Sequence, residues 1–240
     1  MTPPPPRPFA RAAATGFRAV IAAAAATGIV VECVQGSVPL VLSFFTIWTN
    51  ILVVAVFGLS AARTWQRRPD VAPLWRGGVL LFILVTGLVF HLVLANPSSP
   101  FNVVAELSEL SGAKAVANQL LHTVTPIGAV LDFLLLTAPR TLRPGHALQW
   151  LAYPLAYVTF VLVRGALLAP GTQGRYPYPF VDVAQYGYAR VALNAAVLGL
   201  AFYALGLALV AADRFRRASP LAPDAGPVNR ISSPAGGPLK

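Results

Sequence analysis

Residues 40–62 read LVLSFFTIWTNILVVAVFGLSAA, an apolar run that contains the short polar stretch Ser43-Phe44-Phe45-Thr46-Ile47-Trp48-Thr49-Asn50. The run is close to the ~20 helical residues that cross the hydrocarbon core of a membrane. Thr46 and Asn50 lie four residues apart and therefore point to the same face of a helix. The run predicts a membrane-spanning helix that carries one polar face near its beginning.

The composition extends this prediction to the whole chain of 240 residues. Apolar residues make up 56% of it and charged residues only 11%, and the mean hydropathy is +0.66. Soluble globular domains have about 25% charged residues, so this composition indicates an all-α polytopic membrane protein. One cysteine, Cys33, excludes an intrachain disulfide, and three histidines with eight carboxylates argue against a metal cluster. We therefore expect no cofactor.

Six apolar segments are long enough to span a membrane and form a single bundle, which we place in residues 13–212. They cover about residues 17–34, 40–62, 79–95, 115–138, 148–168 and 189–212. Residues 1–12 hold four consecutive prolines and residues 213–240 are basic and then rich in proline and glycine, so both are expected to be disordered. The first segment has a basic start and an alanine-rich core, which also fit a cleaved signal peptide.

The basic residues predict the orientation of the bundle. The two termini and the loops at 63–76 and 139–147 hold 14 of the 18 Lys and Arg residues. Cytoplasmic loops of membrane proteins carry such an excess, so both termini are expected in the cytoplasm of a multi-pass protein of the cell membrane. The net charge of +10 follows from this placement, and we expect neither nucleic acid nor an obligate protein partner.

Polar residues of several segments fall at a similar depth. With a rise of ~1.5 Å per residue, Thr46 lies roughly 9 Å and His122 roughly 10 Å below the outer membrane edge. Polar residues in the same outer half are His91, Arg164, Asn194 and Arg190. Polar groups inside a membrane usually face the bundle interior, which predicts a pocket. Packing of a lone threonine and snorkelling of an arginine to the interface are the competing readings.

Two further features stay open in the sequence. Asp132 lies ten residues below His122 and is too deep to orient it, so we interpret it as a buried structural or proton-linked acid. Its expected partner is Asn50 or a backbone group. The aromatic and proline-rich loop at residues 176–182 fits either an anchor at the membrane interface or a lid over the pocket.

A threonine and a histidine at one depth favour nucleophilic acyl transfer. The neutral imidazole takes the hydroxyl proton while the threonine attacks an ester carbonyl. Asn50, Arg164 or Asn194 are the expected donors to the oxyanion, with His91 as a further pocket residue. A membrane pocket suits membrane lipids or a lipid ester as substrate. The competing class is a small transporter or lipid-binding module, although the first three segments are not clearly repeated in the last three.

Three motifs resemble a bacterial six-helix membrane family related to the animal androgen-induced and androgen-dependent membrane hydrolases. They are residues 44–50 (FFTIWTN), residues 120–126 (LLHTVTP) with Asp132 after them, and the run from Tyr153-Pro154 through Arg164-Gly165 to residues 176–180 (YPYPF). The resemblance covers about residues 15–212. The animal members are threonine hydrolases of fatty acid esters of hydroxy fatty acids. The resemblance implies Thr46 as nucleophile and His122 as its base, with Thr49, one turn away, as the alternative nucleophile.

Overall fold

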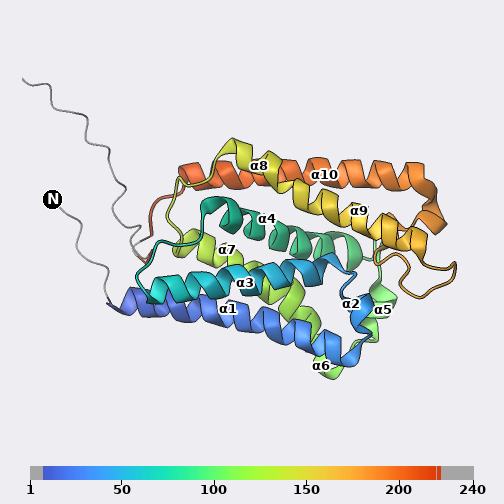
Figure 1. Ribbon diagram of the computed structural model, residues 1–240, viewed down its shortest axis with the longest axis horizontal. Helices are drawn as coiled ribbons and strands as arrows, with labels where there is room; N and C mark the ends of the chain where they lie inside the picture. Colours follow the sequence, from blue (N-terminus) through green and yellow to red (C-terminus); the bar gives the residue numbers. More distant parts are fainter. Residues whose placement is uncertain (1–7, 220, 223–240) are drawn as a thin grey trace, which may run out of the picture.

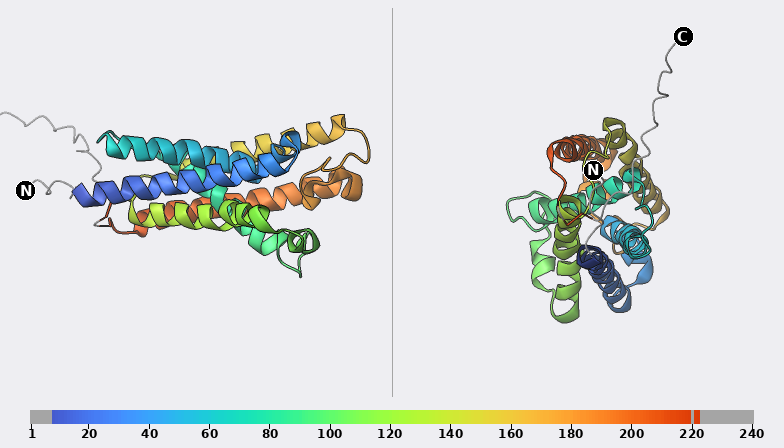
Figure 2. Two further views of the ribbon diagram at one scale, coloured as in Figure 1. Left: turned by 90° about the horizontal axis from the view of Figure 1, so that it is seen from below. Right: turned by 90° about the vertical axis from the view of Figure 1, so that its left-hand side faces the viewer.

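The computed structural model describes residues 8–219, 221 and 222, and every regular element within them is a helix. The long helices lie side by side along the long axis of an elongated bundle (Figures 1 and 2). In chain order the elements are α1 (Pro8–Gln35), α2 (Val38–Val41), α3 (Phe45–Trp65), α4 (Pro73–Val89), the π-helix η1 (Phe90–Leu94), α5 (Val104–Ser108), α6 (Gly112–Gln119), the π-helix η2 (Leu120–Val124), α7 (Thr125–Leu135), α8 (Pro144–Trp150), α9 (Ala152–Leu167), the 3-10 helix η3 (Pro179–Val181) and α10 (Val183–Phe215).

Five helical segments are long and apolar enough to cross a membrane. They are Phe9–Gln35, Phe45–Trp65, Pro73–Leu94, Pro144–Leu167 and Val183–Phe215. This confirms the expected class, a helical protein with several membrane-compatible helices. The segment predicted at residues 115–138 is not one of the five, and in the structure it consists of α6, η2 and α7. These three elements nevertheless follow one another without a gap from Gly112 to Leu135.

Helix α4 is the centre of the bundle. It packs against α3, α7, α8 and α10, and its buried residues include Leu81 and Ile83, which are 1% and 0% exposed. A helix that is apolar on every face can lie at the centre of a bundle within a membrane. The sequence of α4, PLWRGGVLLFILVTGLV, meets this condition after its first turn.

The packed region extends beyond the predicted boundaries at both ends. Helix α1 begins at Pro8 and α10 continues to Phe215, while residues 1–7 and 223–240, expected to be disordered, lie outside the described residues. Asp213, assigned to the tail, is fully buried. Its carboxylate accepts hydrogen bonds from the backbone of Thr141 at 2.6 Å and from Arg216 at 2.8 Å. These donors compensate the buried charge and fasten the end of α10 to the loop after α7.

A buried ionic cluster connects α1, α4 and α7. Asp132 is 2% exposed and Arg18 is 0% exposed, and the Arg18 Nε donates to the carboxylate at 2.7 Å. Arg76 pairs with the other oxygen of Asp132 and with Asp70. The expectation that Asn50 or a backbone group partners Asp132 was wrong, because two arginines predicted near the membrane surface point inward to neutralise it.

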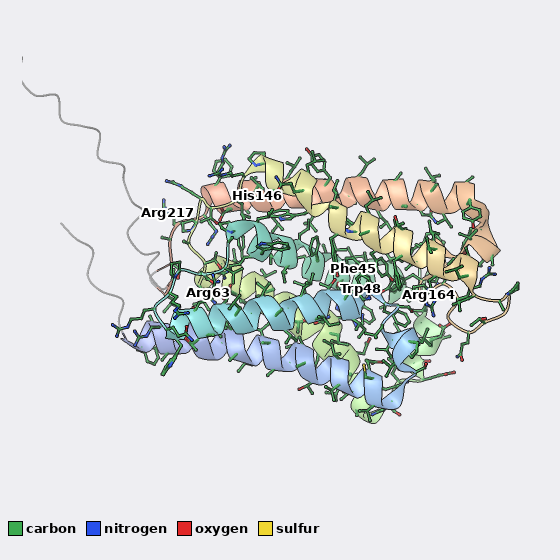
Figure 3. All side chains as sticks on the ribbon, viewed as in Figure 1. Phe45, Trp48, Arg63, His146, Arg164 and Arg217 are labelled. Atoms are coloured by element: carbon green, nitrogen blue, oxygen red, sulfur yellow. The ribbon has the colours of Figure 1, made fainter. Side chains whose placement is uncertain are left out.

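The two ends of the bundle differ in their side chains. Figure 3 places Arg63, His146 and Arg217 toward the end where α1 begins, whereas Phe45, Trp48 and Arg164 lie toward the other end. We call the second end, at which α3 begins, the site end. The two π-helices also belong to it, since η1 follows α4 and η2 precedes α7.

Candidate functional site

The polar stretch at residues 43–50 contains a helix start. Helix α2 ends at Val41 and α3 begins at Phe45, so the predicted continuous span at residues 40–62 is broken. Phe44, the N-cap, has an extended backbone with φ −86° and ψ 135°. The turn is held by Ser43, whose hydroxyl donates to the Leu40 carbonyl at 2.6 Å and whose carbonyl accepts from the Tyr157 hydroxyl at 2.8 Å. Thr46 therefore lies in the first turn of α3, where backbone N–H groups have no partner within the helix.

Thr46 and His122 are in direct contact. The Thr46 Oγ1 lies 3.1 Å from the His122 Nε2, and the His122 Nδ1 lies 3.0 Å from the Asn118 carbonyl oxygen. A carbonyl oxygen only accepts, so in the neutral ring the proton is on Nδ1 and the lone pair is on Nε2. Thr46 donates its hydroxyl proton to this lone pair. The pair has the arrangement that a hydroxyl nucleophile and its general base require.

The orientation of the His122 ring is fixed by the two π-helices. His122 is in η2, and its ring stacks on that of Phe90 in η1 with centroids 4.2 Å apart and an interplanar angle of 22°. Single π-helical turns within α-helices occur frequently at functional sites. Here the wide turn of η2 ends at Val124, two residues before Pro126, which lacks the N–H that a regular α-helix needs.

Tyr178 is a third residue of the site. Its hydroxyl lies 3.3 Å from the Thr46 Oγ1 and accepts a hydrogen bond from the Thr46 backbone N–H at 3.4 Å. Because Thr46 gives its only hydroxyl proton to His122, the Tyr178 hydroxyl donates to the Thr46 Oγ1. Burial raises the pKa of Tyr178, which keeps this proton on the phenol. Sequence reasoning missed Tyr178 as a site residue, although it singled out the aromatic loop at residues 176–182.

Asn50 holds the two halves of the site together. Its side-chain amide donates to the carbonyls of Thr46 at 2.9 Å and Leu121 at 3.3 Å, and it accepts from the Thr125 hydroxyl at 2.9 Å. The residue is fully buried. The prediction that Asn50 donates to an oxyanion was wrong, because one amide hydrogen goes to the Thr46 carbonyl within α3 and the other to the Leu121 carbonyl in η2.

Arg164 and Asn194 hold the loop that carries Tyr178. Arg164 donates to the carbonyls of Gly174 at 2.9 Å and Arg175 at 3.0 Å, and Asn194 donates to the Phe180 carbonyl at 3.0 Å. They reach backbone carbonyls of the loop instead of Thr46, which corrects their expected role as oxyanion donors. The backbone of α9 also lies close to this loop, since a Cβ at Gly165 would be 2.2 Å from the Tyr176 ring.

Two other predicted residues lie apart from the reacting atoms. His91 is exposed in η1, and its Nε2 is 3.1 Å from the Thr123 hydroxyl. Thr49 is fully buried, and its hydroxyl has no hydrogen-bond partner among the described residues. Neither side chain lines the cavity beside Thr46, so the geometry favours Thr46 over Thr49 as the nucleophile.

A cavity of about 650 Å³ adjoins Thr46 and His122. Its volume lies within the ~300–1,000 Å³ of known ligand pockets. It extends between α4, α9 and α10 and has no charged residue in its wall; the lining is Phe45, Thr46, Val85, Thr86, Val89, Phe90, Leu94, His122, Leu148, Leu151, Ala152, Pro154, Leu155, Tyr157, Val158, Tyr178, Phe180, Val181, Ala195, Ala196, Leu198, Gly199 and Phe202. Leu148 and Leu155 in this lining are each 65% exposed, so the cavity opens at the side of the bundle along α9.

Fold and site together define a class, a helical membrane protein in which a threonine and a histidine meet at the wall of an apolar cavity. Within the described residues, no three His, Cys, Asp or Glu side chains lie close enough to hold a metal ion. Comparisons with known protein families, with curated proteins and with solved structures found no match to this chain. Its function is therefore inferred from the site itself.

Proposed function

We propose that this protein is an integral membrane hydrolase of lipid esters, with Thr46 as nucleophile and His122 as general base. The observation that carries the proposal is the 3.1 Å contact between the Thr46 Oγ1 and the His122 Nε2, with the opposite ring nitrogen engaged by the Asn118 carbonyl. The same assignment is implied by the resemblance of residues 44–50 and 120–126 to the bacterial six-helix family that is related to the animal threonine hydrolases.

The reaction proceeds through a covalent acyl-enzyme. The Thr46 Oγ1 forms a bond to the ester carbonyl carbon while its proton passes to the His122 Nε2. The bond from this carbon to the alcohol oxygen then breaks, and His122 gives the proton to the departing alkoxide. Water attacks the acyl group in the second half, its proton passes to His122, and the carboxylic acid leaves as the proton returns to Thr46.

The substrate is a long-chain ester that approaches from the membrane. The cavity wall is almost entirely apolar, and its opening along α9 lies on an apolar helix. A hydrocarbon chain fits such a wall, whereas a charged head group has no partner in it. Among membrane lipids, esters of fatty acids fit this description. The protein acts on them within the cell membrane.

The proposed topology has six spans with both termini in the cytoplasm. In addition to the five long helices, the span that is fourth in chain order is the uninterrupted run α6–η2–α7, from Gly112 to Leu135. It is about 36 Å long at a rise of ~1.5 Å per residue. That length exceeds the ~30 Å hydrocarbon core. Under this topology the basic end of the bundle is cytoplasmic, and the site end faces the outer half of the membrane.

Activity-based labelling tests the proposal. Purified protein in detergent micelles is treated with a fluorophosphonate probe, and the modified residue is located by peptide mass spectrometry. We expect one adduct, on the Thr46 hydroxyl, and hydrolysis of p-nitrophenyl decanoate that the probe abolishes. A well-folded protein that neither reacts with the probe nor hydrolyses the ester contradicts the proposal and favours the transporter or lipid-binding class.

The preference of the enzyme for a given acyl-chain length is expected to depend on Gly199. This residue lies on the cavity-facing side of α10 with Ala195 and Phe202, and a Cβ added to it has no atom within 4 Å. A larger side chain at this position therefore has open space at its Cβ and extends toward the cavity. We expect Gly199→Leu to lower kcat/KM for p-nitrophenyl palmitate about tenfold, as for overpacking by ~1.4 kcal/mol, with little change for p-nitrophenyl butyrate.

The matched control for chain length is Ala201→Leu. Ala201 is exposed on the same helix and does not line the cavity, so the same increase in size should leave both esters unaffected. An equal loss for the palmitate and the butyrate in Gly199→Leu contradicts the assignment of the cavity to the acyl chain.

A further inference from the structure

We propose that Tyr178 is a catalytic residue that donates a hydrogen bond to the oxyanion formed on the substrate. This inference rests on the proposed hydrolase function and deepens it. Its geometric basis is the position of the Tyr178 hydroxyl, 3.3 Å from the Thr46 Oγ1 and 3.4 Å from the Thr46 backbone nitrogen. A donor this close to the nucleophile is also within reach of the carbonyl oxygen that the nucleophile attacks.

The other polar side chains of the cavity are already committed. Five residues in the lining carry a polar side-chain atom, namely Thr46, Thr86, His122, Tyr157 and Tyr178. The Thr86 hydroxyl donates to the Phe82 carbonyl at 3.0 Å, and the Tyr157 hydroxyl donates to the Ser43 carbonyl at 2.8 Å. Once Thr46 and His122 serve as nucleophile and base, Tyr178 is the lining residue whose proton is directed at the reacting atoms.

The hydrogen bond of Tyr178 changes its acceptor during the reaction. Before attack, the Tyr178 hydroxyl donates its hydrogen bond to the Thr46 Oγ1. As the Oγ1–carbon bond forms, the electron pair of the carbonyl moves to the carbonyl oxygen, while the Oγ1 becomes an ester-type oxygen and a weaker acceptor. The Tyr178 hydroxyl then donates to the negative oxygen, which is bonded to the same carbon. The phenol keeps its proton throughout, and the proton of Thr46 goes to His122.

The hydroxyl of Tyr178 is held in place before the substrate binds. Its ring stacks on Phe180 with centroids 5.2 Å apart and an interplanar angle of 6°, and it meets the edge of Phe44 at 5.6 Å. The loop on both sides is fastened by Arg164 and Asn194. The first turn of α3 adds a partial positive charge at the same point through its aligned peptide dipoles. Donors fixed in this way stabilise a transition state without reorganisation.

The test is Tyr178→Phe, which removes the hydroxyl and keeps the stacked ring. We expect kcat for p-nitrophenyl decanoate to fall on the order of 10²-fold with KM nearly unchanged, as for loss of one oxyanion donor. The rate of fluorophosphonate labelling should fall in parallel. Tyr176→Phe is the matched control, because it removes a hydroxyl from the same loop at a residue that does not line the cavity. Its kcat should equal that of the wild type.

A second variant separates chemistry from structure. Difluorotyrosine at position 178 keeps the ring and a hydroxyl of greater acidity, so it should retain most of the kcat that Tyr178→Phe loses. This variant tests the hydroxyl even if Tyr178→Phe folds poorly. A kcat of Tyr178→Phe equal to that of Tyr176→Phe overturns the role of Tyr178, and so does a difluorotyrosine variant that is as slow as Tyr178→Phe. Loss of activity in Thr46→Ala in either case keeps the hydrolase proposal. If Thr46→Ala retains full activity, the hydrolase proposal itself fails.

Discussion

Thr46→Ala is expected to abolish fluorophosphonate labelling and to lower kcat for p-nitrophenyl decanoate by at least about 10³-fold. The variant removes the atom that forms the covalent bond, and loss of a nucleophile in a coupled pair has effects of this size or larger. Labelling and hydrolysis are measured on wild-type and variant proteins whose melting temperatures are equal, so that a loss of activity is not a loss of folded protein. Thr46→Ala removes only a hydroxyl and a methyl group, so the fold should stay intact although the side chain is 7% exposed.

Four further variants sharpen this prediction. Thr49→Ala removes the alternative hydroxyl, which lies off the cavity, and should retain labelling. His122→Ala should lose about as much activity as Thr46→Ala, and the double variant should lose little more, because a nucleophile and its base act as a unit. His91→Ala controls for the loss of a histidine from the neighbouring π-helix. Labelling that persists in Thr46→Ala but disappears in Thr49→Ala would reverse the assignment.

Asp132→Ala is expected to destabilise the protein by about 3–5 kcal/mol, the usual consequence of breaking a buried ion pair from one side. The substitution removes the carboxylate that accepts from the Nε of Arg18, which is 0% exposed, and leaves this guanidinium only the Asp70 carboxylate at 3.2 Å. It also removes one of the two carboxylates that pair with Arg76. The melting temperature in detergent micelles, followed by the fluorescence of a thiol dye at Cys33, measures the effect.

The effect of Asp132→Ala should be on stability and not on chemistry. Asp132 lies ten residues from His122, or roughly 15 Å along the helix, so the fraction of protein that stays folded should label with the fluorophosphonate at the wild-type rate. Glu106→Gln is the control, because an exposed carboxylate changes stability by no more than about 0.5 kcal/mol. An unchanged melting temperature in Asp132→Ala contradicts a structural role for the ionic cluster.

The helical class and the candidate pair could be predicted because they depend on local quantities. The length of an apolar run indicates a membrane helix because the hydrocarbon core has a nearly constant thickness. The constant rise of a helix placed Thr46 and His122 at one depth although they are 76 residues apart. The helix start at Phe45 was not predicted, because the turn before it is stabilised by the Tyr157 hydroxyl, a contact from α9.

Several side chains were assigned to the pocket by depth alone and belong elsewhere. Depth does not specify direction around a helix, and the direction of a polar side chain is set by the nearest unpaired acceptor. Arg164 and Asn194 donate to such acceptors, the carbonyls of the loop that carries Tyr178. Each assignment therefore required the positions of segments distant in the sequence.

By itself the sequence determined a helical membrane protein with a threonine and a histidine at similar depth, since composition and helical rise are properties of each segment alone. Only the tertiary structure decided that Thr46 lies in the first turn of a helix, that it touches His122, and that the Tyr178 hydroxyl contacts Thr46. These three features arise where α3, η2 and the loop before α10 meet. Their contacts depend on how three separate segments pack, which no single segment specifies.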